Sequence, residues 1–114
     1  MPIKIINQKI SKYEITKLAQ ETYGEMVKGV VDIRQKIMAL GGELHADCET
    51  VLLEQGSSQS DLWGINIFPD QGNDKRIEFT SLINIRPNQG NRSIEIQDKN
   101  LQKQVSAIVN NLLE

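Results

Sequence analysis

Residues 62–68 read LWGINIF and residues 76–86 read RIEFTSLINIR, and both runs alternate between apolar and other side chains. Successive side chains of a strand point to opposite faces, so Trp63, Ile65 and Ile67 would share one side of the first run. The apolar side of the second run would carry five residues: Ile77, Phe79, Ser81, Ile83 and Ile85. Turn-forming residues 69–75 separate the runs. The pattern predicts an antiparallel pair of strands with one buried face and places Trp63 in the core.

Three helices flank these strands. Ser11 and Glu14 form a capping box at the start of a helix predicted over residues 12–22. Asp47 is predicted to be the N-cap of a second helix over residues 47–55, with Gly56 after its last turn. Asp98 would cap a final helix, whose apolar stripe has helical spacing. The stripe consists of Leu101, Val105, Ile108, Val109 and Leu112.

Residues 26–42 fit two structures. A β-hairpin pairing residues 26–33 with residues 37–42 is favoured by the β-branched cluster Val30-Val31-Asp32-Ile33. One long helix ending at Gly41 is the alternative. With a short strand at Ile3 to Ile6, the predicted order is β-α-β-β-α-β-β-α. The chain is therefore predicted to be a single α+β domain over residues 1–114, with a mainly antiparallel sheet covered by three helices.

Composition excludes several classes of protein. The 114 residues fit one domain, and the net charge of −2 argues against a nucleic-acid binder that acts through bulk positive charge. The single cysteine, Cys48, allows no intramolecular disulfide, which fits a reducing cytoplasm, and we expect it to be a small buried residue. Residues 1–7 do not resemble a signal peptide, and no apolar run reaches the roughly 20 residues of a membrane span.

The first polar segment that the helix and strand patterns leave unexplained contains Glu43, His45 and Asp47. His45 is the only histidine in the chain, and the three residues would lie on one side of an extended backbone. Imidazole and carboxylate groups serve as acid–base catalysts or metal ligands. The trio is therefore a candidate catalytic group for a hydrolase, either with a divalent metal or without one. A capping or surface role is the alternative, and no second cluster of His or Cys supports a closed zinc site.

The second polar segment spans residues 84–93. Arginine forks and amides near a glycine turn suit a phosphate or carboxylate, which makes this segment a candidate ligand-binding site for an anion. The candidate residues are Asn84, Arg86, Asn88, Asn91, Arg92 and Ser93. No standard phosphate-loop motif is present. The alternative is a structured loop whose arginines pair with nearby carboxylates.

Four runs together resemble a known family: GGELHAD at 41–47, DLWGIN at 61–66, INIRP at 83–87 and GNRS at 90–93. The family is an uncharacterised one of short, single-domain prokaryotic proteins, classed as a domain of unknown function, and the resemblance covers roughly residues 3–96. It implies a free-standing protein, and it implies no activity, cofactor or partner. Its motifs include both polar segments.

Three functions follow from these observations. The first is a cytoplasmic binding or regulatory module for an anionic, phosphate-bearing small ligand. The second is a hydrolase that uses His45 with Glu43 or Asp47 in a pocket shared with an arginine. The third is an interaction module, such as a homodimer, with Leu82 and Phe68 among its apolar contacts. Contact between the 41–48 segment and the 84–93 loop would join the two polar segments into one site.

Overall fold

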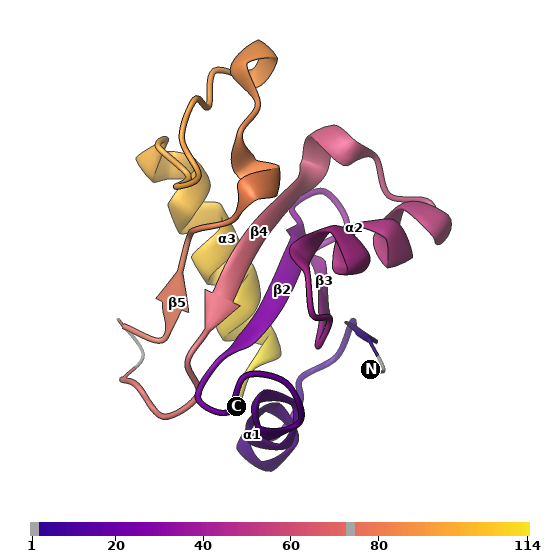
Figure 1. Ribbon diagram of the computed structural model, residues 1–114, viewed down its shortest axis with the longest axis vertical. Helices are drawn as coiled ribbons and strands as arrows, with labels where there is room; N and C mark the ends of the chain where they lie inside the picture. Colours follow the sequence, from indigo (N-terminus) through magenta and orange to yellow (C-terminus); the bar gives the residue numbers. More distant parts are fainter. Residues whose placement is uncertain (1–2, 73–74) are drawn as a thin grey trace.

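The computed structural model describes residues 3–72 and 75–114, which form an antiparallel sheet between helices (Figure 1). The strands are β1 (Lys4–Ile6), β2 (Val27–Asp32), β3 (Ile37–Leu40), β4 (Leu62–Ile67) and β5 (Ile77–Glu78). The helices are α1 (Lys12–Glu21), α2 (His45–Glu54) and α3 (Lys99–Leu112). The five strands lie in the order β1-β3-β2-β4-β5. The predicted α+β class and the order of elements are confirmed.

The hairpin prediction for residues 26–42 is confirmed, and the long helix is wrong. β2 and β3 pair antiparallel, with Val30 opposite Ala39. The turn between them is stabilised by Asp32, whose Oδ1 accepts hydrogen bonds from the backbone N–H groups of Arg34 and Gln35. A side chain that satisfies the backbone of its own turn fixes the hairpin register locally.

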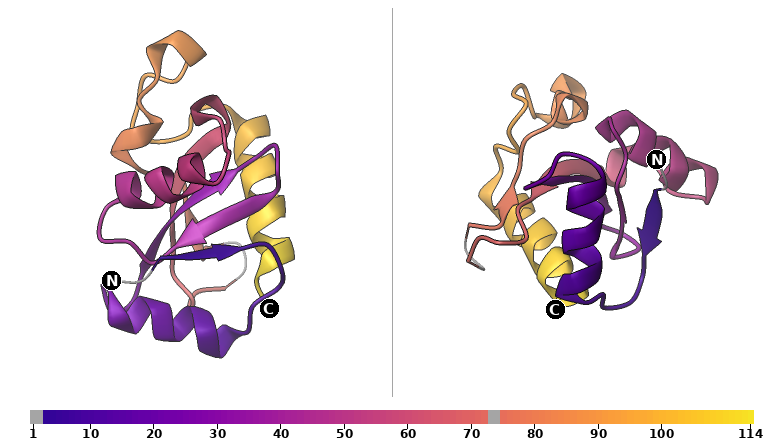
Figure 2. Two further views of the ribbon diagram at one scale, coloured as in Figure 1. Left: turned by 90° about the vertical axis from the view of Figure 1, so that its right-hand side faces the viewer. Right: turned by 60° about the horizontal axis from the view of Figure 1, so that its bottom comes forward.

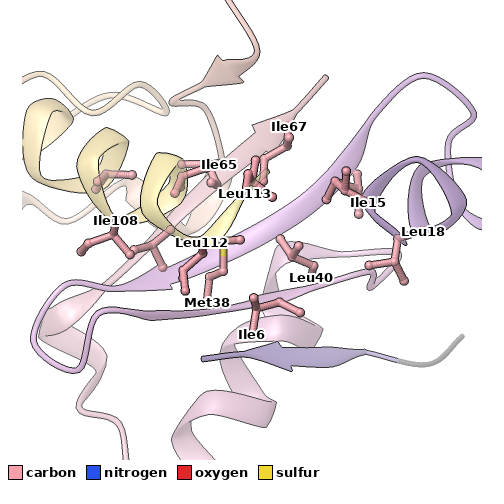
Figure 3. Close-up of a cluster of buried hydrophobic side chains, with 14 of the residues drawn as sticks. Ile6, Ile15, Leu18, Met38, Leu40, Ile65, Ile67, Ile108, Leu112 and Leu113 are labelled. Atoms are coloured by element: carbon pink, nitrogen blue, oxygen red, sulfur yellow. The ribbon is translucent and has the colours of Figure 1, made fainter. Parts of the chain in front are cut away.

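Helices cover both faces of the sheet (Figure 2). On one face, α1 and α3 pack their apolar stripes against side chains of the strands (Figure 3). Trp63 belongs to this core, as the alternation of its run predicts. On the other face, α2 buries Cys48 and Leu52 against Val30, Ala39 and Leu62. The burial of Cys48 is confirmed, and it raises the pKa of the thiol to about 11, which keeps the sulfur protonated.

Two of the three helix starts are confirmed. Ser11 Oγ accepts a hydrogen bond from Glu14 N, and Asp98 caps α3 through Asn100 N and Leu101 N. The predicted start of the second helix is wrong, because α2 begins at His45 and its N-cap is Leu44. Asp47 lies in the first turn instead, and its Oδ2 accepts from Leu44 N at 3.3 Å. None of the helices in residues 3–72 and 75–114 is both long and apolar enough to cross a membrane.

The strand predicted over residues 76–86 is mostly wrong. β5 covers only Ile77–Glu78, and short 3-10 turns follow at Leu82–Asn84 and Pro87–Gln89. The chain leaves the sheet after Glu78, and Ser81 begins the first 3-10 turn, because its Oγ accepts from Ile83 N. As a result, the predicted faces do not hold: Ile85 is exposed, and Asn84 is buried. Positions 73 and 74 of the predicted turn 69–75 lie outside the described residues.

The segment that leaves the sheet packs on Gly64 of β4. A Cβ atom at Gly64 would lie 2.4 Å from Ser81 Cβ, so a glycine is required for this approach. The Asn84 amide takes the place of a neighbouring strand: Oδ1 accepts from Gly64 N at 2.8 Å, and Nδ2 donates to Gly64 O at 3.0 Å. The sheet edge is therefore completed by a side chain where β5 has ended.

Candidate functional site

The sheet brings His45 into a pocket but does not bring Glu43 and Asp47 with it. His45 is buried, and its Nε2 lies 2.8 Å from Ile65 O of β4. Asp47 is exposed and bonds Leu44 N, while the exposed Glu43 accepts a hydrogen bond from the Tyr23 hydroxyl through its backbone carbonyl. The expectation that the three residues share one side is wrong, because a helix begins at His45 and ends the extended spacing.

The His45 pocket lies between the start of α2 and the 80–94 segment, above β2 and β4. Its volume is about 360 Å³, and its lining is mostly apolar. The polar lining comes from Lys28, His45, Asn66, Thr80 and Ser81. The apolar lining comes from Leu44, Ala46, Leu82, Ile83 and Ile94. A concave, apolar pocket with a few convergent polar groups is the usual form of a small-molecule site.

The imidazole of His45 is held in one orientation and one protonation state. A backbone carbonyl only accepts hydrogen bonds, so the contact with Ile65 O places the proton of the neutral ring on Nε2. Nδ1 is then an acceptor. Burial is the main cause that lowers the pKa of His45; the hydrogen bond with Ile65 O opposes it, the charge of Lys28 lowers the pKa further, and Asn66 raises it slightly. The pocket therefore contains a neutral histidine at pH 7.

Asn66 contributes an acceptor that has no donor. Its Nδ2 donates to Glu78 Oε1 at 2.8 Å and to Thr80 O at 3.2 Å, and two acceptors on this side fix the orientation of the amide. The residue is 7% exposed, and its Oδ1 is buried without a hydrogen-bond partner. The side chain of Asn66 also acts to raise the pKa of His45. Unsatisfied buried acceptors are rare, and a functional role is one explanation for them.

Lys28 supplies the positive charge of the His45 pocket. Its Nζ lies 4.9 Å from the centre of the Tyr23 ring. No carboxylate forms an ion pair with it in the part of the chain that the structure describes. The ammonium group therefore lies beside the pocket against an aromatic face.

The second polar segment, which we call the Arg86 loop (residues 84–93), is organised differently. The guanidinium of Arg86 is buried, lies 4.7 Å from the centre of the Trp63 ring and pairs with Glu49 of α2 at 3.3 Å. It also donates to Ile83 O at 3.1 Å and to Gln59 O at 2.9 Å. Burial lowers the pKa of Arg86, and Glu49 opposes this shift. Arg86 thus joins α2, its own loop and the segment before β4.

The remaining candidates of the Arg86 loop divide into structural and exposed residues. Asn84 is fully buried against Gly64, and Asn91 Nδ2 donates to the carbonyl oxygens of Asn84, Ser93 and Glu95. Ser93 Oγ accepts from Glu95 N. Asn88 and Arg92 are exposed, and Asn88 lines a second, polar pocket of about 330 Å³ with Glu49 and Arg86. The alternative of a structured loop describes most of these residues, because their donors bond the backbone.

The two polar segments are neighbours, but they do not form one cavity. α2 contacts the loop through the pair of Glu49 and Arg86, and the two pockets share only Leu82 and Ile83 in their walls. The lining of the His45 pocket contains no carboxylate and no arginine. Among residues 3–72 and 75–114, no group of three or more His, Cys, Asp or Glu side chains could hold a metal ion. The arrangement required by the hydrolase hypothesis is absent from these residues.

Sequence reasoning did not find Lys28, Asn66 or Glu49 as site residues. One signal was available for Lys28, because it is a charged residue inside the otherwise apolar run of β2, from Val27 to Val31. A lysine flanked by buried strand residues must reach a polar environment or a partner. Asn66 and Glu49 carried no comparable signal, because polar residues in those positions are typical of exposed strand and helix faces.

Comparison with known proteins gives a family and no further relatives. The model of a family described as "Protein of unknown function (DUF5674)" matches residues 4–112. No curated protein and no solved structure matches the chain.

Proposed function

The chain belongs to the DUF5674 family of proteins of unknown function, and we propose that it is a binding module for a small ligand with an apolar body and an anionic head. The observation that carries the proposal is the position of Lys28. Its ammonium group borders a pocket with apolar walls, and the described residues give it no carboxylate partner. A cation at the edge of an apolar site attracts an anion more strongly than the same cation in open water does.

The apolar walls fit the body of such a ligand. Three large side chains at the pocket are exposed, with Leu82 at 78%, Leu44 at 58% and Ile94 at 43%. Exposed apolar groups that gather around one hollow mark a binding site more often than scattered ones do. The pocket volume of about 360 Å³ lies within the range of small-molecule sites.

The proposed ligand is anionic, as expected from the sequence, but we propose that it binds in the His45 pocket and not at the Arg86 loop. Arg86 already faces Glu49, and its donors are bonded to backbone carbonyls, so it offers little charge to a phosphate. Lys28 makes no such contacts with the described residues. We therefore place the anionic head beside Lys28 and His45, with Thr80 as a hydroxyl contact. Arg92 and Asn88, which are exposed, lie outside this pocket's lining.

The proposal places the protein in a prokaryotic cytoplasm. The family resemblance supports a prokaryotic source, and the free, buried Cys48 fits a reducing compartment. The net charge of −2 supports a small-molecule ligand over a nucleic acid.

A homodimer is the second candidate, because Leu82 exposes apolar surface at the same pocket and the exposed Ile85 lines the neighbouring polar pocket. A second copy could cover these side chains in place of a ligand. Sedimentation velocity over a range of protein concentrations tests this candidate. A Leu82→Ser variant that shifts the protein from dimer to monomer would support it, and a wild-type protein that stays monomeric would exclude it.

Octyl sulfate below its micelle concentration is a suitable probe for the proposed function, because it joins an apolar chain to a permanent negative charge. We expect its titration into labelled protein to shift the amide NMR signals of Lys28, Ala46, Thr80 and Leu82. Octanol has the same chain without the charge and should bind more weakly. Shifts that avoid the pocket, or equal binding of octanol, would contradict the proposal.

Lys28→Met tests the charge directly, because methionine keeps most of the side-chain length. We expect octyl sulfate to bind this variant about tenfold more weakly, since one charge-assisted contact contributes about 1.5 kcal/mol. Lys103→Met, on the exposed side of α3, is the matched control and should bind as the wild type does.

A further inference from the structure

The His45 pocket presents an excess of hydrogen-bond acceptors at its polar end. With Nε2–H donated to Ile65 O, the neutral imidazole offers only the acceptor Nδ1. Asn66 Oδ1 is a second acceptor, buried and without a partner. The amide cannot turn over to supply a donor, because Nδ2 is already bonded to Glu78 and to the carbonyl of Thr80. One more N–H at this end of the pocket would therefore be well placed.

The charged groups around His45 explain why the free protein does not gain this N–H. Lys28 approaches from β2, and its charge opposes a second positive charge on the ring. The contacts from β4 are the neutral groups Ile65 and Asn66, and the 80–83 segment brings no ionisable side chain to the pocket. On α2 itself, Asp47 bonds the helix start and Glu49 pairs with Arg86. Glu78 of β5 reaches the amide of Asn66 and not the ring. No carboxylate in the described residues therefore neutralises the ring.

We propose, on the basis of the function proposed above, that the anionic head of the ligand binds together with one proton, which His45 takes up from solvent at Nδ1. The anion offsets the charge of Lys28 and faces the new imidazolium. The added N–H supplies the donor that the acceptors at the polar end of the pocket lack. In the free protein the ring is neutral, and in the complex it is the cation.

The pH dependence of ligand affinity follows from this uptake of a proton by His45. The pKa of His45 in the free protein lies below its ordinary value of 6.5, and an adjacent anion raises it in the complex. Between these two pKa values the complex binds more protons than the free protein does. Ligand affinity therefore increases as the pH falls, by up to about tenfold per pH unit for one proton.

Octyl sulfate again serves as the probe, because its charge is constant over this pH range. Calorimetric titrations at one pH, in buffers with different ionisation enthalpies, measure the number of protons taken up on binding. We expect net uptake by the wild type between about pH 7 and about pH 6 and none by His45→Gln. Glutamine keeps an N–H that can reach Ile65 O but does not titrate. The dissociation constant of this variant should be independent of pH, and Lys103→Met should behave as the wild type does.

A second measurement covers the case in which His45→Gln does not fold. His45 is the only histidine in the chain, so one imidazole signal in the NMR spectrum reports its titration. Saturation with octyl sulfate should raise the pKa of that signal. Binding at the pocket without proton uptake and without this rise would overturn the inference and leave the proposed function intact. Failure of octyl sulfate to bind the pocket at any pH would overturn both.

Discussion

The Arg86 loop and the His45 pocket are both polar, yet they differ in how far their polar groups are already satisfied. In the loop, Arg86, Asn84 and Asn91 direct their donors at backbone carbonyls or at Glu49. In the pocket, Lys28 has no ion pair among the residues described, and Asn66 Oδ1 has no hydrogen bond. The Arg86 loop has the residue types of a binding site, but its polar groups already have partners. The His45 pocket has polar groups that could still bind a ligand.

This difference shows that residue types alone do not identify a site. Arginine and asparagine suit anions, but they suit the irregular backbone of a long loop equally well, because that backbone has few partners of its own. The comparison can be tested by asking which region loses stability when its polar groups are removed. Substitutions in the loop should affect folding, and substitutions in the pocket should affect binding.

The largest effect is expected for Arg86→Met. The side chains of Arg86 and Glu49 are 9% and 12% exposed, so the variant leaves a buried carboxylate without its partner. We expect a loss of about 4 kcal/mol in the free energy of unfolding, measured by urea denaturation. Adding Glu49→Gln should recover part of the loss. Arg92→Met, at an exposed position, is the control. If both variants changed the free energy of unfolding by the same small amount, Arg86 would not stabilise the loop.

Asn84→Ala should have the next largest effect. It removes the partners of Gly64 N, Gly64 O and Ile94 O, which are bonded at 2.8, 3.0 and 3.1 Å. The expected loss is about 3 kcal/mol by the same measurement, since buried backbone groups would be left unsatisfied. Asn84→Asp should not rescue stability, because a carboxylate cannot donate to Gly64 O. Asn88→Ala is the exposed control. If Asn84→Ala lost no more stability than Asn88→Ala, the strand-like role of Asn84 would be contradicted.

The pH dependence of stability should distinguish His45 from the buried carboxylate of Asp32. The folded state lowers the pKa of His45 below 6.5, so the unfolded chain binds more protons as the solution is acidified. Stability is therefore complete above about pH 6.5 and decreases as the pH falls through the folded pKa. His45→Gln should remove this decrease in urea denaturation measured across the pH range. An unchanged profile would show that His45 is not the responsible group.

Asp32 acts in the same direction at lower pH. Burial raises the pKa of Asp32, but hydrogen bonds from Gln35, Ser57 and Arg34 together lower it below 3.8. Its contribution is therefore retained above that value and lost on stronger acidification, so the two groups titrate in separate ranges. His45→Gln should leave the acid-induced loss below about pH 4 unchanged.

The smallest effect on stability is expected for Lys28→Met. No ion pair in residues 3–72 and 75–114 involves Lys28, so its removal should change the free energy of unfolding by no more than about 0.5 kcal/mol. The same variant should weaken octyl sulfate binding. A stability loss above about 1 kcal/mol would assign Lys28 to the scaffold and weaken the contrast between the two regions.

The elements of the fold that depend on local signals could be predicted from the sequence. Ser11 and Asp98 mark helix starts through their own backbone contacts, and the β-branched cluster at Val30 favours the hairpin. The prediction of a strand over residues 76–86 was wrong, because their alternation continues through a segment that leaves the sheet after Glu78. The close packing of this segment on the sheet requires Gly64, which lies in β4. The residues around Gly64 in the sequence do not indicate that another segment packs there.

The candidate site was predictable only in part. His45 was found because a single histidine in a polar segment is conspicuous, and the structure places it in a pocket. Its partners come from β2, β4 and the 80–94 segment, and their convergence depends on strand order. Spacing along the chain gives no information about such contacts. The prediction that Glu43 and Asp47 lie beside His45 was wrong for a local reason, because α2 begins at His45.

The Asn84 amide has a consequence for the behaviour of this protein at high concentration. Beyond the two residues of β5, the outer edge of β4 would present bare peptide groups on which another chain could assemble. By bonding both Gly64 N and Gly64 O, one side chain stops that growth at its starting point. We therefore expect Asn84 to hinder fibre-like aggregation at this edge, which many proteins prevent with a covering segment or with edge lysines.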